Sequence, residues 1–114
     1  MTINEFSDFC SSLASDDLNI ESPAILHSVL GIAGEAGELV DAIKKNVVYH
    51  SPLDMDNVKE ELGDLLHYIM RLTTACGWTF QDVIDTNVAK LQIRYPNGYS
   101  NEAAIARADK GGEK

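Results

Sequence analysis

Apolar residues recur every three to four positions in four stretches of the chain, which is the spacing of amphipathic helices. Each stretch opens with residues that cap helix starts: Thr2 with Glu5, Ser22 before Pro23, Asp54 or Asp56, and Thr79 with Asp82. The expected helices span residues 3–13, 23–45, from the cap at 54 or 56 to about 76, and 79–95. A short further helix is expected within residues 100–108. No stretch predicts a convincing strand, so the pattern indicates an all-α fold with four principal helices.

The second and third expected helices carry acidic residues three positions apart within apolar runs. These residues are Glu35 and Glu38 in the second helix, and Glu61 and Asp64 in the third. Residues three apart share one face of a helix, so two such helices side by side would aim four carboxylates at one point. Four anions so close repel one another and resist loss of water unless a cation lies among them. The pattern therefore predicts a hard divalent cation, Mg²⁺ first and Mn²⁺ as the alternative.

Acidic residues on helices are usually solvated surface charges, which is the competing interpretation of this pattern. A solvated face normally has lysines interleaved with the acids, and no lysine lies between the members of either pair. This difference favours the metal site. Glu60, Asp41 and Asp85, by contrast, are interpreted as surface charges.

Three glycines, Gly31, Gly34 and Gly37, recur within the second helix, although each costs about 1 kcal/mol relative to alanine. Two explanations carry equal weight. Small residues permit close approach of another helix, and they also leave room for a metal and a substrate beside the carboxylates.

Asn87, Lys90 and Arg94 lie on one face of the fourth helix, at positions i, i+3 and i+7. Two cations aligned with an amide suit the oxygens of a polyphosphate, in a chain with only 9 basic residues. A solvated helix face is the competing interpretation. The carboxylate pattern on the neighbouring helices favours the phosphate site.

Tyr68 and His27 are further candidates for contact with a substrate. Tyr68 lies one turn beyond Asp64, and His27 lies two turns before Glu35 on the same face. A packed tyrosine and a surface histidine are the ordinary interpretations of these residues. Trp78 is interpreted as an anchoring or interface aromatic in preference to a stacking platform for a nucleobase.

The charge balance excludes one large class of ligand. The 114 residues hold 18 acidic and 9 basic side chains, a formal charge of −9, whereas long nucleic acids bind basic surfaces. No apolar run reaches the length of a membrane span, and the first residues lack the features of a signal peptide. Cys10 and Cys76 are too few for a disulfide framework and suit a reducing compartment. We expect a cytoplasmic protein with one domain, residues 1–110, and a frayed tail at 111–114.

The second helix carries apolar residues on more than one face. Ile25 and Val29 form one stripe, and Leu26, Leu30 and Ala33 form another, which one neighbouring helix cannot cover together with the first. Buried apolar area contributes about 25 cal/mol per Å², so an uncovered stripe would forgo much stabilisation. We therefore expect an oligomeric helical bundle, as a homodimer or a dimer of dimers.

Three blocks of sequence together resemble one protein family. They are GEAGELVDAI at residues 34–43, EELGDLL at 60–66 and KLQIRYPNG at 90–98. In this order they are similar to the MazG-like nucleoside triphosphate pyrophosphohydrolases, of an all-α superfamily that includes dimeric dUTPases and dCTP pyrophosphatases. The resemblance implies Mg²⁺-dependent hydrolysis of a nucleoside triphosphate to the monophosphate and pyrophosphate.

The resemblance also implies roles for individual residues. It makes the four carboxylates metal ligands and the polar residues of the fourth helix phosphate binders, and we take Glu38 or Glu35 as the general base. One departure is Gly34, where the fuller family pattern has a further glutamate; a branch that resembles the dCTP pyrophosphatases also has glycine there. Two alternatives stay open: a non-catalytic helical dimerisation module with a structural cation, and an enzyme of the same superfamily that acts on a phosphoribosyl-nucleotide.

Overall fold

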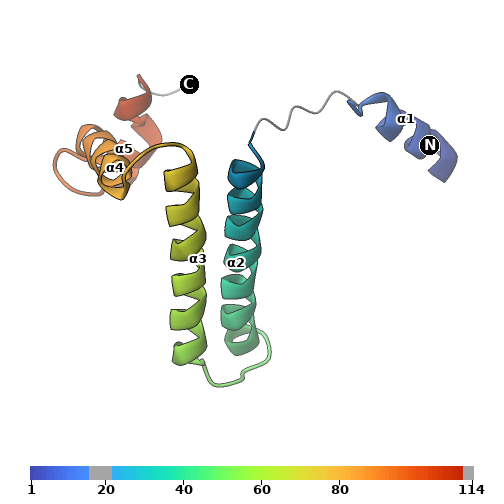
Figure 1. The fold of residues 1–114 in the computed structure, drawn as a ribbon, viewed down its shortest axis with the longest axis horizontal. Coiled ribbons are helices and arrows are strands. Elements are labelled where there is room, and N and C mark those ends of the chain that lie inside the picture. The colour runs from blue at the N-terminus through green and yellow to red at the C-terminus, as the bar shows by residue number, and fades with distance from the viewer. Residues whose placement is uncertain (16–21, 112–114) are drawn as a thin grey trace.

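The computed structural model describes residues 1–15 and 22–111 (Figure 1). Its elements are α1 (Ile3–Ser12), α2 (Pro23–Val47), α3 (Met55–Ala75), α4 (Phe80–Arg94), α5 (Asn101–Ala106) and the 3₁₀-helix η1 (Ala108–Lys110). The described residues form no strand, which confirms the expected all-α fold. The short η1 was not expected. Residues 112–114 of the expected frayed tail lie outside the described residues.

The helices begin where side chains satisfy their free backbone amides. In each of the four principal helices, one oxygen accepts the N–H of the residue three positions on, and these oxygens belong to Thr2, Ser22, Asp54 and Thr79. Of the two candidate caps for α3, Asp54 is the one used, because its Oδ1 lies 3.1 Å from the nitrogen of Asn57. Gly77, with a φ of +77°, then turns the chain from α3 towards α4.

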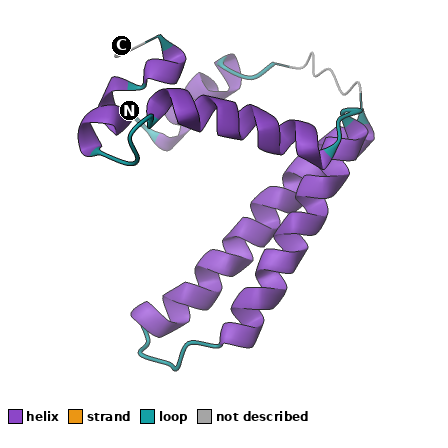
Figure 2. Cartoon of the chain, turned by 90° about the vertical axis from the view of Figure 1, so that its left-hand side faces the viewer, coloured by secondary structure: helices purple, strands orange, loops and turns teal. Residues whose placement is uncertain are grey.

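α2 and α3 form an antiparallel hairpin and lie side by side (Figure 1). α4 begins beyond the last turn of α3 and runs away from the hairpin on the side of α3 that faces away from α2 (Figures 1 and 2). α5 and η1 lie against α4, whereas α1 stands apart from the hairpin (Figure 1). The single chain is therefore an open arrangement built on one helical hairpin.

The single chain buries very little apolar surface. Among the described residues, Ala42 is the only buried apolar one, at 7% exposure. Large apolar side chains are exposed on both hairpin helices and on α4, among them Leu26, Val29, Leu30, Val40, Leu62, Leu66, Met70, Ile84 and Val88. None of the described helices is long and apolar enough to cross a membrane. The expected stripe of Leu26, Leu30 and Ala33 on α2 is thus uncovered in the structure, and in the other stripe Val29 is exposed and Ile25 is half-buried.

An ion pair between Arg94 and Asp109 joins the C-terminal segment to α4. Nε and Nη2 of Arg94 donate to the two carboxylate oxygens of Asp109, at 2.5 and 2.9 Å. The Asp109 side chain is 1% exposed, and the guanidinium of Arg94 holds the pKa of this carboxyl below its usual range. The pair fixes η1 against α4, just after Arg107 reverses the chain in a left-handed conformation, with a φ of +50°.

Candidate metal and nucleotide site

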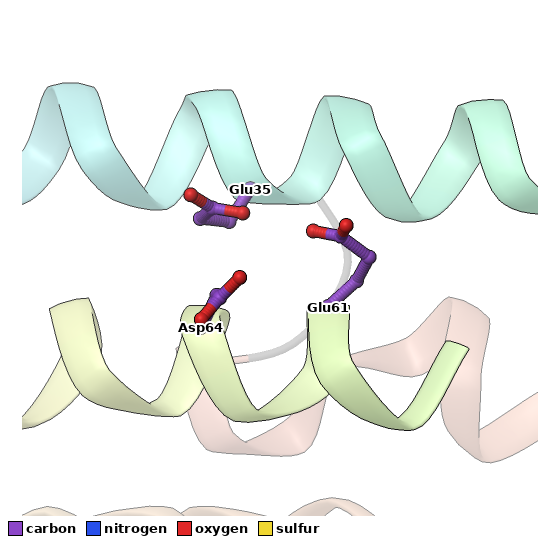
Figure 3. Close-up of side chains that lie close together, drawn as sticks. All are labelled: Glu35, Glu61 and Asp64. Atoms are coloured by element: carbon purple, nitrogen blue, oxygen red, sulfur yellow. The ribbon is translucent and has the colours of Figure 1, made fainter. Parts of the chain in front are cut away.

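Three carboxylates meet between the two helices of the hairpin. Glu35 extends from α2, and Glu61 and Asp64 extend from α3 towards it (Figure 3). One oxygen of each side chain lies within 4.8 Å of the others. The three-residue spacing places Glu61 and Asp64 on one face of α3, and the antiparallel pairing brings that face to Glu35.

Within this group, Glu61 is the carboxylate whose surroundings most disfavour its charged form. Its Oε2 is buried without a hydrogen-bond partner. Burial raises the pKa of Glu61, and the nearby carboxyl of Glu35 raises it further, followed by the charges of Asp64 and Glu38. An acceptor atom that has lost water and faces other carboxylates is stabilised by a cation. Both the geometry and the electrostatics thus fit a metal ion.

Glu38 is close to this group but is not one of its three members. Its charge contributes to the raised pKa of Glu61, so it lies within electrostatic reach. It is also exposed, unlike the half-buried Glu35 and Glu61. Glu38 therefore stands beside the three carboxylates on the solvent side, where it can contact water.

The glycines of α2 serve different purposes. A Cβ atom at Gly31 would lie within about 2.3 to 2.5 Å of the ring carbons of Tyr68, so the ring occupies the space that a side chain would need. A Cβ atom at Gly34 or Gly37 would meet nothing within 4 Å. Close helix contact therefore explains Gly31, whereas the other two glycines are exposed and border open space, so room for a metal and a substrate stays a prediction for them.

Tyr68 is the centre of a ring cluster one turn from the carboxylates. Its ring contacts His27 of α2 edge-on, at 5.9 Å between centroids, and His67 at 5.1 Å. The guanidinium carbon of Arg71 lies 6.0 Å from the ring centroid of Tyr68. The structure thus places both predicted substrate contacts, Tyr68 and His27, on the same side of the hairpin as the carboxylates.

The predicted phosphate binders on α4 lie elsewhere in the single chain. Asn87 and Lys90 line a hollow of about 390 Å³ together with Trp78, Asp82, Val83 and Thr86. At about 1.5 Å per residue, the part of α3 from Asp64 to its end spans roughly 16 Å, and α4 starts beyond that end (Figures 1 and 2). One chain alone therefore does not bring Asn87 and Lys90 to the carboxylates.

Arg94, the third predicted phosphate binder on α4, already has a partner within its own chain. Sequence spacing suggested a guanidinium free to bind phosphate, but both its Nε and Nη2 are engaged by Asp109. The side chain of Arg94 is only 18% exposed. In this structure Arg94 fixes the C-terminal segment, and a role in phosphate binding stays a prediction.

Comparison with known proteins bears on the whole arrangement. The family model of the MazG nucleotide pyrophosphohydrolase domain matches residues 25–99, which include all of α3 and α4 and α2 from Ile25 onward. The chain belongs to this family. A curated relative, the Gene 37 protein of Mycobacterium phage L5, is 31% identical over 75 residues, which cover 60% of this chain and 64% of the relative. The chain thus spans less than two thirds of that relative's length. No solved structure matches the chain.

One residue of this MazG domain escaped the sequence analysis. Arg71 continues the face of α3 that carries Glu61, Asp64 and Tyr68, at successive spacings of three, four and three residues. This spacing is visible in the sequence and was the available signal. A lone arginine on a helix is ordinary, however, and a ring contact is not unusual either, since Lys44 lies 5.9 Å from the ring centroid of Tyr49. What distinguishes Arg71 is that its ring partner, Tyr68, lies on the helix face of the carboxylates.

Proposed function

We propose that this protein hydrolyses a nucleoside or deoxynucleoside triphosphate to the monophosphate and pyrophosphate with the help of a divalent cation. The observation that carries the proposal is the carboxylate group of Glu35, Glu61 and Asp64, with the buried and unpartnered Oε2 of Glu61. Membership of the MazG family supports the reaction class. A role in cleansing the nucleotide pool, in the cytoplasm, is the biological setting that we predict.

The donor set suits Mg²⁺, with Mn²⁺ as the alternative. All three donors are carboxylate oxygens, the ligands that hard divalent cations prefer. Ligand oxygens at about 2.1 Å from one Mg²⁺ lie within about 4.2 Å of each other. One oxygen from each of the three carboxylates lies within 4.8 Å of the others, so a small movement of the side chains would bring them to one ion. Glu35, Glu61 and Asp64 would hold the ion, and Glu38 is the candidate for a fourth ligand. A bound cation would neutralise charge on phosphate oxygens and acidify water.

Hydrolysis also needs a base that takes a proton from the attacking water. Glu38 is exposed and outside the three-carboxylate group, so we propose that it takes the proton from the attacking water, with Glu35 as the alternative base. The water oxygen forms a bond to the α-phosphorus, and the bond from that phosphorus to the bridging oxygen of the β-phosphate breaks. Pyrophosphate leaves with the electron pair of that bond.

We also propose that the functional unit is at least a homodimer. The apolar side chains exposed on α2 and α3 would pack against a second copy, and the site needs that copy. Asn87 and Lys90 lie on α4, which starts beyond the end of α3, so α4 of another copy would supply them. A dimer of dimers satisfies the same requirement.

The proposed reaction is tested by a screen over deoxynucleoside and nucleoside triphosphates with Mg²⁺. Added inorganic pyrophosphatase converts pyrophosphate to phosphate, which malachite green detects. We expect release from at least one triphosphate only when both enzymes and Mg²⁺ are present. Stabilisation by Mg²⁺ without turnover on any triphosphate would instead favour the two alternatives, the non-catalytic dimerisation module and the enzyme that acts on a phosphoribosyl-nucleotide.

Light scattering at micromolar protein concentration tests the assembly. The expected mass is twice or four times that of one chain, because a single copy leaves its apolar faces in water. An active and stable species with the mass of one chain would overturn the proposed dimer and the shared site together.

A further inference from the structure

We propose that Arg71 binds the β- and γ-phosphates of the substrate and stabilises the pyrophosphate as it leaves. The proposal rests on the proposed hydrolysis and adds a residue to it. Arg71 lies on the same face of α3 as the carboxylates Glu61 and Asp64, two turns beyond Asp64 or roughly 10 Å along the axis.

The direction of the side chain favours this role. Side chains on a helix tilt towards its N-terminus, so Arg71 leans from its own turn towards Tyr68 and Asp64. The guanidinium carbon accordingly lies 6.0 Å from the centroid of the Tyr68 ring, one turn nearer to the carboxylates. A polyphosphate held at the carboxylates through a cation would extend along this face towards the guanidinium.

Tyr68 holds the guanidinium of Arg71 in position. The ring fills the space left by Gly31 on α2 and contacts His27 and His67 edge-on, so it is held from several directions. A cation over such a ring gains about 0.5–1 kcal/mol at an exposed site. Seating the guanidinium in advance lowers the entropy lost when it binds phosphate.

The charge of Arg71 is available to a ligand. None of the ion pairs found within residues 1–15 and 22–111 involves Arg71, and the residue is exposed. Arg94, by comparison, is occupied by Asp109, and Lys90 lies on α4 beyond the end of the hairpin. A planar guanidinium binds phosphate oxygens in pairs, and its charge would oppose that of a leaving pyrophosphate. Arg71 is therefore a cation that a chain can offer to a substrate at its own carboxylates.

The test compares Arg71→Ala with Arg71→Lys and with Lys59→Ala, which removes one positive charge from the same helix away from this face. Two quantities are measured: kcat/KM on the best triphosphate of the screen, and the affinity for inorganic pyrophosphate with Mg²⁺ by calorimetry. We expect Arg71→Ala to lower kcat/KM by about a hundredfold and the pyrophosphate affinity by at least about tenfold. For Arg71→Lys, we expect both quantities to fall between those of wild type and of Arg71→Ala. For Lys59→Ala, both should stay within about twofold of wild type. The melting temperatures of all three variants should lie within a few degrees of that of the wild type.

A double-variant cycle tests whether Tyr68 acts by positioning Arg71. Tyr68→Leu should weaken pyrophosphate binding less than Arg71→Ala, and the double variant should bind no more weakly than Arg71→Ala alone. Additive losses of pyrophosphate affinity would show that Tyr68 does not act through Arg71 and would overturn its proposed role in positioning the guanidinium. Wild-type pyrophosphate affinity in Arg71→Ala, with an active wild-type enzyme, would overturn the proposal and leave the reaction standing. A wild-type protein without turnover would overturn the reaction and this proposal with it.

Discussion

Glu61→Gln and Asp64→Asn are each expected to abolish hydrolysis and to raise the melting temperature of the metal-free protein. Both side chains belong to the three-carboxylate group, and removing one ligand charge weakens cation binding. We expect turnover to fall by more than about a hundredfold, the upper end seen when even the partners of metal ligands are lost. The same change relieves repulsion at the half-buried Glu61 in the absence of metal, so the fold gains stability.

The matched control for Glu61→Gln is Glu60→Gln, which removes the same charge one residue away on an exposed position of α3. Turnover is measured with Mg²⁺, and melting temperature is measured in EDTA. The control should leave both close to wild type. Wild-type turnover in either carboxylate variant would show that the cation site is misassigned, and a large fall in melting temperature would point to a structural role.

Lys90→Ala is expected to weaken triphosphate binding more than it disturbs the fold. Lys90 borders a hollow on α4 and its chemistry suits a phosphate. The melting temperature should change by no more than a few degrees, because no ion pair of Lys90 is present among the described residues. Equal losses of affinity and melting temperature would mark Lys90 as structural.

Mixing two variants, at a triphosphate concentration too low for Lys90→Ala alone to turn over, tests whether Lys90 serves the carboxylates of another copy. A mixed dimer of one Asp64→Asn chain and one Lys90→Ala chain has two sites. If each site takes its carboxylates from one chain and Lys90 from the other, one site carries both substitutions and the other site carries neither. Random pairing makes about half of the dimers mixed, so about a quarter of wild-type activity should return after unfolding and refolding the two together. A site built from one chain would stay inactive in every combination.

The sequence was informative wherever a relation runs along a single helix. Capping residues such as Thr2 and Thr79 could be recognised because they act on amides three residues away. Glu61 and Asp64 could be placed on one face because the helical period is fixed. Their meeting with Glu35 followed from one further assumption, that a short connection pairs the two helices.

Relations between elements could not be read in the same way. The partner of Arg94 lies 15 residues away in η1, beyond α5 and the left-handed turn at Arg107, and no spacing rule reports that distance. The position of α4 at the end of the hairpin depends on the turn after α3. The spacing of Asn87 and Lys90 shows that they share a face, but it does not show where that face points.

The contact between Gly31 and Tyr68 also sets the alignment of the two helices along their axes. The most buried hydroxyls of the hairpin, on Ser28 and Thr73, donate to carbonyls of their own helices at 2.7 and 2.8 Å, and so do not hold one helix against sliding along the other. The ring of Tyr68 in the gap at Gly31 does hold it. A slip of one turn, about 5.4 Å, would carry Glu35 away from its two partners, so a glycine that binds nothing keeps the three carboxylates in register.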